Sequence, residues 1–249
     1  MQPSTSSDVV GSPSKCVVLV PTFSHIEPAC ERALRELENR GYVVRRQYGF
    51  SQIDYGRNVM ASAALRDGFE QLMWIDADIS FQPEFVDQLR QHRLPLVTGI
   101  YTKKGPRALA CEVLAETEQI VFGNGGGLVP IRYAPGGFLL THRRVYETIQ
   151  QKLALTLCNQ RRHRQTAFYP FFQPMIVPDE GGHFYLGEDF AFCERARQCG
   201  FEIIADSSQR LFHIGSYGYS WEDAGNGTTR YGAYTYRIVG EPTETDPKS

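Results

Sequence analysis

Two carboxylates, Asp76 and Asp78, stand at the end of an apolar run that covers residues 71–75. Side chains two apart on an extended backbone project to the same side, and open α/β sheets bind ligands at the carboxyl ends of their strands. At an effective dielectric constant of about 20, two unit charges about 4 Å apart repel by about 4 kcal/mol. A shared divalent cation is a natural counter-charge. Hard oxygen ligands suit Mg²⁺ or Mn²⁺, whose remaining positions diphosphate oxygens can fill.

Two other interpretations of this pair stay open. Asp78 can cap the following helix while Asp76 pairs with an arginine or lysine, because a two-carboxylate pattern also arises by chance. A phosphatase with a nucleophilic aspartate is the second alternative. That pattern normally follows the first strand and continues into a threonine, whereas this pair follows the third predicted strand and continues as Ile79-Ser80.

A second acidic pair, Glu188 and Asp189, comes directly before the predicted helix from Phe190 to Gln198. The helix dipole and the free amides of the first turn stabilise a carboxylate as the anion, so we expect deprotonation near neutral pH. An ionised carboxylate within hydrogen-bond reach of a hydroxyl can act as a general base. Acidic residues at helix starts are also ordinary caps, which is the favoured interpretation for the pair in isolation.

His213 is an imidazole inside an otherwise apolar strand pattern at residues 210–214. A neutral imidazole is a borderline ligand that suits Mn²⁺ better than Mg²⁺. The alternative, a buried histidine that hydrogen-bonds a backbone carbonyl, is more common for an isolated histidine.

The elements that must position these side chains alternate between strands and helices. Short apolar runs predict strands at 16–20, 42–48, 71–75 and 96–101. Helical spacing or caps predict helices at 26–37, from Asp54 to Arg66, and from Pro83 through Leu89. This alternation predicts an α/β protein with a mostly parallel sheet and helices on both faces.

The second half of the chain has a mixed character. Strands are predicted at 111–114, 119–122, 136–140, 202–205 and 210–214, a helix at 143–151, and irregular structure at 153–182. We expect one continuous domain over residues 15–240, between disordered tails at 1–14 and 241–249.

Composition limits the partners. Lys and Arg total 26 and Asp and Glu total 28, a net charge of −2, which argues against nucleic-acid binding. No apolar run approaches the roughly 18 residues of a membrane span, and no apolar signal core precedes the first strand. We therefore expect a cytoplasmic protein. Its six cysteines are scattered along the sequence, so we expect them to be reduced. The basic cluster at 161–164 leaves peripheral contact with a membrane or another anionic acceptor open.

Taken together and in order, these segments resemble glycosyltransferases of the GT-A type, the nucleotide-sugar-dependent fold of family 2 enzymes and their relatives. Short single-domain members from bacteria and large DNA viruses are the most similar in kind. The resemblance runs from Cys16 to about Tyr219. Residues 20–22 (Val-Pro-Thr) resemble the opening nucleotide-binding segment, and residues 56–58 (Gly-Arg-Asn) are similar to an Arg-Asn pair that approaches the nucleotide.

The remaining motifs follow in the same order. Asp76-Ala77-Asp78 corresponds to the metal and diphosphate motif, and residues 134–140 resemble the strand beneath the sugar pocket. Glu188-Asp189 matches the acidic pair whose aspartate is the base in inverting members, and His213 matches a late metal ligand. Recognition of uracil or guanine stays open, since the family's acidic residue after the second strand has no clear counterpart unless it is Asp54.

The resemblance implies a metal-dependent glycosyltransferase that moves a sugar from a UDP- or GDP-sugar to a glycan or other hydroxyl acceptor, with inversion. Residues 15–101 would form the nucleotide-binding half and 102–240 the acceptor half. The implied donor-binding residues are Pro21, Thr22, Asp54, Arg57, Asn58, Asp76 and Gly137. The implied ligands of Mn²⁺ or Mg²⁺ are Asp76, Asp78 and His213, and the implied catalytic residues are Asp189, as base, and Glu188. A metal-dependent nucleotide-sugar hydrolase or phosphatase and a non-catalytic nucleotide-binding scaffold are the alternatives.

Overall fold

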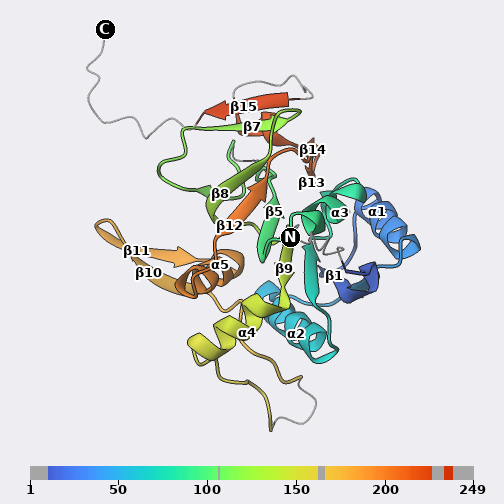
Figure 1. The fold of residues 1–249 in the computed structure, drawn as a ribbon, viewed down its shortest axis with the longest axis vertical. Helices are drawn as coiled ribbons and strands as arrows, with labels where there is room; N and C mark the ends of the chain where they lie inside the picture. Colours follow the sequence, from blue (N-terminus) through green and yellow to red (C-terminus); the bar gives the residue numbers. More distant parts are fainter. Residues whose placement is uncertain (1–10, 106, 162–165, 226–232, 238–249) are drawn as a thin grey trace, which may run out of the picture.

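The centre of the computed structural model is a mixed eight-stranded sheet (Figure 1). Its strands are β1 (Cys16–Pro21), β2 (Val43–Gln47), β3 (Gln71–Ile75), β5 (Leu96–Gly99), β6 (Glu112–Val113), β8 (Leu128–Tyr133), β9 (Phe138–His142) and β12 (Ile203–Asp206). Their order is β2-β1-β3-β9-β5-β12-β8-β6. Only β9 and β8 run against the common direction within the described residues, 11–105, 107–161, 166–225 and 233–237. The predicted α/β class with a mainly parallel sheet is confirmed.

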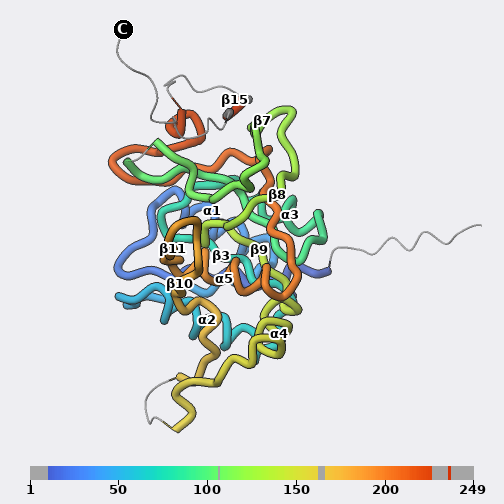
Figure 2. Tube along the Cα trace, turned by 90° about the vertical axis from the view of Figure 1, so that its left-hand side faces the viewer, coloured from blue at the N-terminus to red at the C-terminus, as the bar shows by residue number. Residues whose placement is uncertain are grey.

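Helices cover both faces of the sheet. They are α1 (Pro28–Asn39), α2 (Ile53–Arg66), α3 (Glu84–Gln91), α4 (Arg143–Lys152) and α5 (Glu188–Gln198). Buried side chains of α1 and α3 pack on one face, and those of α2, α4 and α5 pack on the other. The described parts of the segment that joins α4 to the next strand extend away from the sheet (Figure 1 and Figure 2).

The sequence of β1 shows why the sheet is covered twice. All six of its residues are buried. Val17 and Leu19 belong to the core beneath α2, α4 and α5, whereas Val18 and Val20 belong to the core beneath α1 and α3. A strand with two covered faces needs apolar side chains at every position, which is why its sequence is continuous rather than alternating.

Three small sheets complete the described structure. One joins β4 (Ile79–Ser80), β13 (Phe212–Ile214) and β14 (Gly218–Tyr219). A hairpin of β10 (Met175–Asp179) and β11 (Gly182–Leu186) projects from the side of the central sheet (Figure 1). The third pairs β7 (Gln119–Gly123) with β15 (Ala233–Arg237). In the described ranges, no helix is long and apolar enough to cross a membrane.

Several local expectations differ from the structure. The β10–β11 hairpin lies largely in the stretch that was predicted to be irregular, and Pro178 inside β10 hides it, since proline argues against a central strand. The first turn of α2 contains Asp54, but Gln52 is the cap residue. Of the predicted tails, residues 13–15 form a 3₁₀ turn, while residues 1–10 and 241–249 lie outside the described residues.

Candidate functional site

A cleft of about 610 Å³, the first cleft, opens where β1 and β3 end. Pro21, the last residue of β1, and Thr22, which follows it, line the cleft, and Asp76 and Asp78 line it from the segment after β3. Two adjacent parallel strands end at the same edge of the sheet, so motifs 55 residues apart in sequence meet here, as the topology rule for such sheets requires. The structure brings these four predicted residues together.

Asp78 and His213 face each other because β13 pairs with β4. This ladder sets His213 opposite Ile79, and Asp78 Oδ2 lies 3.5 Å from His213 Nε2 and 2.5 Å from Lys104 Nζ. The Nδ1 of His213 lies 2.9 Å from the carbonyl oxygen of Thr102, so Nδ1 donates and the neutral ring keeps its lone pair on Nε2, toward Asp78. Partial burial alone would raise the pKa of Asp78, but the protonated ring of His213, whose Nε2–H then faces the carboxylate, and the ammonium of Lys104 lower it to about 2.

This pair fits a divalent cation that is completed by other oxygen ligands. A carboxylate oxygen and an imidazole lone pair that point at each other are donors for Mn²⁺ or Mg²⁺. Across the described part of the chain, no group of three or more His, Cys, Asp or Glu side chains is arranged to hold a metal ion. Of the predicted ligands, Asp78 and His213 lie together, whereas Asp76 turns toward Arg57.

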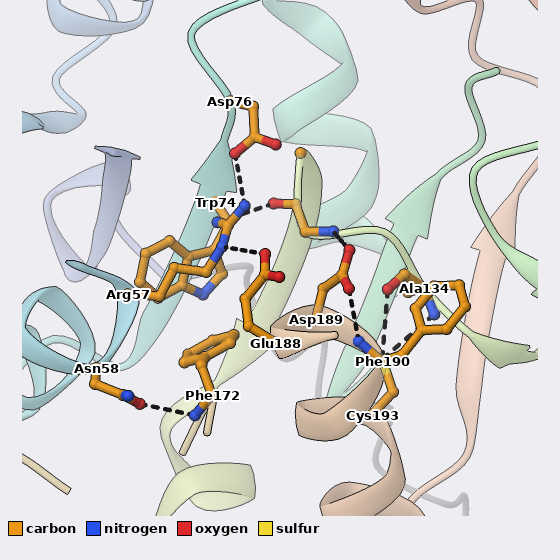
Figure 3. A network of polar contacts seen from close by, with 12 residues as sticks. Arg57, Asn58, Trp74, Asp76, Ala134, Phe172, Glu188, Asp189, Phe190 and Cys193 are labelled. Atoms are coloured by element: carbon orange, nitrogen blue, oxygen red, sulfur yellow. Dashed lines mark hydrogen bonds and ion pairs between the residues drawn. The ribbon is translucent and has the colours of Figure 1, made fainter. Parts of the chain in front are cut away.

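Arg57 is the centre of a buried network (Figure 3). Its Nη2 donates to Asp76 Oδ1 at 2.7 Å, its Nε to Glu188 Oε1 at 3.4 Å and its Nη1 to the carbonyl of Gly136 at 3.3 Å, while the guanidinium lies over the ring of Trp74. Burial opposes the charge, yet the neighbouring carboxylates raise its pKa. Arg57 lines neither cleft and joins Asp76 to Glu188, so its predicted contact with a diphosphate stays a prediction.

Glu188 and Asp189 begin α5, as predicted, but their surroundings differ from those of an exposed cap. Asp189 Oδ2 accepts from the amide of Gly136 at 3.1 Å, and Oδ1 accepts from the amide of Phe190 at 2.8 Å. Burial raises the pKa of both carboxyls, against the opposing charge of Arg57. The helix N-terminus therefore does not dominate these groups, because removal from water outweighs it.

Asp189 lines a second cleft of about 410 Å³, next to the first. Tyr101 and His213 contribute to its wall, and Tyr185 of the projecting hairpin, 65% exposed, stands at it. Lys104 lines both clefts. Asp78 thus belongs to the first cleft and its neighbour His213 to the second, together with Asp189, and the two clefts share the side chain of Lys104.

Gly136 and Gly137 allow the site to be this compact. A Cβ on Gly137 would lie 2.3 Å from the hydroxyl of Tyr101 and 2.9 Å from Asp76 Oδ2, and one on Gly136 would lie 2.8 Å from Arg57 Nη2. The amide of Gly137 donates to the Tyr101 hydroxyl at 3.0 Å. Gly137 is therefore placed beneath Asp76, where no side chain fits.

Like Arg57 and Gly137, the predicted donor residues Asn58 and Asp54 do not line the first or the second cleft. Asn58 is buried, and its Oδ1 accepts from the amide of Phe172 at 2.7 Å, which anchors the segment before the hairpin. Asp54 is in the first turn of α2, and neither residue is among those that line the two clefts. Their predicted roles have no geometric support in the described residues.

Tyr101 and Tyr185 reach the clefts without having been predicted as site residues, and Lys104 does so although a solvent-exposed lysine was favoured over a phosphate contact for this loop. Tyr101 and Lys104 follow the end of β5, the same kind of position as Asp76 after β3, and this was the available signal. No signal in the sequence pointed to Tyr185, because its position depends on the β10–β11 hairpin, which was not predicted. Of the basic cluster at 161–164, residues 162–164 lie outside the described residues.

Comparison with known proteins gives a fold but no family. The sequence matches no protein-family profile, and it matches no curated protein. Protein A197 from STIV is a structural neighbour with a TM-score of 0.55 and 13% identity, over 94% of this chain and 99% of that one. A UDP-glucose pyrophosphorylase complexed with UDP-glucose scores 0.34 at 12% identity (80% and 75% covered), and S. aureus TarS 1-349 scores 0.37 at 11% (84% and 61%). The likeness to A197 shows that the arrangement of elements occurs in another protein.

Proposed function

We propose that the protein is a metal-dependent glycosyltransferase that moves a sugar from a nucleoside diphosphate sugar to a hydroxyl acceptor. One observation carries this proposal: Asp78 of the first cleft lies 3.5 Å from His213 of the second cleft, the second cleft also holds a partly buried carboxylate of raised pKa, Asp189, and Lys104 belongs to both clefts. Transfer between two substrates requires two neighbouring sites with different chemistry, and this arrangement supplies them.

The first cleft suits the donor. Asp78 and His213 would hold Mn²⁺ or Mg²⁺, which when bound offsets the charge that builds on the leaving diphosphate. Lys104 can turn from Asp78 toward a phosphate oxygen, because an ammonium on a flexible stem is a mobile point charge. Phe23, 68% exposed at this cleft, offers an apolar ring face to a nucleobase.

The second cleft suits the acceptor. Asp189 takes the proton of the acceptor hydroxyl, the acceptor oxygen forms a bond to the anomeric carbon, and the bond from that carbon to the diphosphate breaks, which inverts the configuration. The raised pKa makes Asp189 a stronger base than an exposed aspartate. The two backbone amides that Asp189 accepts from hold it in place. Tyr185 gives the ring of a sugar an aromatic face.

The decisive experiment incubates the full chain with UDP- and GDP-sugars and Mn²⁺, with and without a panel of hydroxyl acceptors, and measures release of the nucleoside diphosphate. Release that an acceptor stimulates supports transfer. Release that no acceptor changes shows a nucleotide-sugar hydrolase, and thermal stabilisation without release shows a binding scaffold. Either of the last two results overturns the proposal.

A further inference from the structure

A third cleft lies at the opposite edge of the same sheet from the proposed active site. It has a volume of about 270 Å³ and lies where β1, β3 and β5 begin and β9 ends. These strands are consecutive in the order β1-β3-β9-β5. We call it the basic cleft after the charged and ionisable side chains that line it: Lys15, Glu70, Arg90, Arg93, His142 and Arg144.

The charges in the basic cleft are unbalanced. Four of its side chains are cationic and one, Glu70, is anionic, in a chain whose net charge is −2. Glu70 lies 3.5 Å from Lys15, which neutralises it. Arg90 is buried and donates to Gln71 Oε1 at 2.8 Å and to backbone oxygens, so its role is structural.

Arg93 and Arg144 are the cations that remain. Among the described residues, neither guanidinium has a hydrogen-bond or ion-pair partner, and both side chains are exposed at the cleft. Arg93 also has a φ of 55°, the left-handed conformation that glycine adopts most readily. The chain therefore carries an unpaired guanidinium at a backbone position that suits glycine.

His142 adds a neutral donor to these two cations. The amide of Arg144 donates to His142 Nδ1 at 3.2 Å, so the neutral ring carries its proton on Nε2. Burial lowers the pKa of His142, and the charge of Arg144 lowers it further. A cleft that disfavours a further positive charge while offering N–H donors is complementary to an anion.

We propose that the basic cleft binds a phosphate-bearing ligand, which Arg93 and Arg144 grip by their guanidinium groups. Arginine forks match the oxygens of a phosphate bidentately, and the first turn of α4, which His142 caps, adds the positive end of a helix dipole. Free phosphate or diphosphate and the headgroup of an anionic lipid share this chemistry. The site does not depend on the proposed transferase activity, because it shares no residue with either of the other clefts.

The test titrates the full chain with pyrophosphate in the presence of a chelator, which keeps the metal-dependent first cleft unloaded. We expect saturable binding by calorimetry and, by NMR, a rise in the pKa of His142. Arg93→Gly and Arg144→Gln should each weaken the affinity about tenfold, the loss of one charge-assisted contact. Arg93→Gly keeps a favourable backbone, so its melting temperature should not fall.

Two controls and one further arm complete the test. Arg32→Gln removes an exposed arginine of α1 outside the cleft and should leave the affinity unchanged, as should Lys104→Ala in the other clefts. Vesicles of phosphatidylcholine with phosphatidic acid distinguish the headgroup of an anionic lipid from a free phosphate as the ligand. Sedimentation with them that Arg93→Gly abolishes assigns a lipid headgroup, and pyrophosphate binding without sedimentation assigns a free phosphate. No saturable binding in either arm, or binding that both cleft variants retain, overturns the proposal.

Discussion

Asp78 carries a pKa of about 2 and therefore keeps its charge at every pH above that value. The variant Asp78→Asn removes the charge with little change in shape, so the part of UDP or GDP binding that requires Mn²⁺ should disappear. Thermal shift with nucleotide, with and without Mn²⁺, measures this part through ligand linkage. Asp67→Asn, a surface aspartate paired with Arg45, is the matched control and should behave as the parent protein. An intact Mn²⁺-dependent shift in Asp78→Asn would remove Asp78 from the site.

Asp189→Asn separates binding from chemistry. Asparagine cannot take the acceptor proton, so transfer should fall by about 10²–10⁴-fold. Donor binding should persist, because Asp189 lines only the second cleft. Turnover and nucleotide affinity measured on the same preparation check the prediction. Near-normal turnover would reduce Asp189 to a helix cap.

The close approach at Gly137 predicts a cost in stability. Gly137→Ala places a methyl 2.3 Å from the Tyr101 hydroxyl and 2.9 Å from Asp76 Oδ2, so both must shift. Overpacking of this kind lowers the free energy of unfolding by about 1–3 kcal/mol. Chemical denaturation measures the loss. The control is Gly127→Ala, whose new methyl would have no atom within 4 Å. It should lower the free energy of unfolding less than Gly137→Ala does. Equal stability of the two variants would contradict the packing described around Gly137.

The β10–β11 hairpin is the element that the proposed acceptor would contact. Tyr185 and Ile176 are directly opposite each other on it and are both exposed, but only Tyr185 lines the second cleft. Tyr185→Ala should therefore raise KM for the acceptor and leave the melting temperature and donor binding unchanged. Ile176→Ala should alter none of them. A common effect of both variants would assign the hairpin a general rather than a local role.

Periodicity predicts most elements and little of their spatial order. β1, α1, β3 and α4 lie within about two residues of their predicted positions, because continuous apolar runs and helical spacing encode burial directly. The reversed strand β9 lies between β3 and β5, and no pattern within a strand specifies its neighbours. β8 escaped prediction because Pro130 and the preceding glycines conceal it.

For the candidate site as well, the sequence predicted individual residues but not their contacts. Asp78 and His213 were singled out from residue type and local pattern, and the structure brings them together. Their meeting depends on the short strand β4, which is too brief to recognise in a sequence. The partners of Arg57 could not be predicted either, since an ion pair from α2 to Asp76 after β3 and a hydrogen bond to the Gly136 carbonyl before β9 leave no local signal.

Across the molecule, two sets of carboxyls change the free energy of unfolding in opposite directions as the pH changes: Asp78 is one, and Glu188 with Asp189 is the other. The pKa of Asp78 is lowered on folding, so its contribution, about 1 kcal/mol after solvent screening, is present above about pH 4 and is lost as the pH falls toward 2. The pKa values of Glu188 and Asp189 are raised, so their contribution is complete below about pH 4 and is lost as the pH rises through the folded values.

This difference in sign is measurable. From about pH 4 to pH 8, the free energy of unfolding of Asp189→Asn should rise relative to that of the parent chain, because the variant no longer buries a titrating carboxyl. Urea denaturation at several pH values gives both curves. Parallel curves over this range would show that burial does not raise the pKa of Asp189.

The position of Lys104 has a kinetic consequence. Its ammonium pairs with Asp78 and forms part of the wall of both clefts. A cation or a diphosphate that engages Asp78 must displace Lys104, and the hollow on the other side then changes its shape and charge. Under the proposed reaction, the order of binding is therefore compulsory. The nucleotide sugar binds first, and the acceptor binds only afterward, when displacement of Lys104 has completed the second cleft.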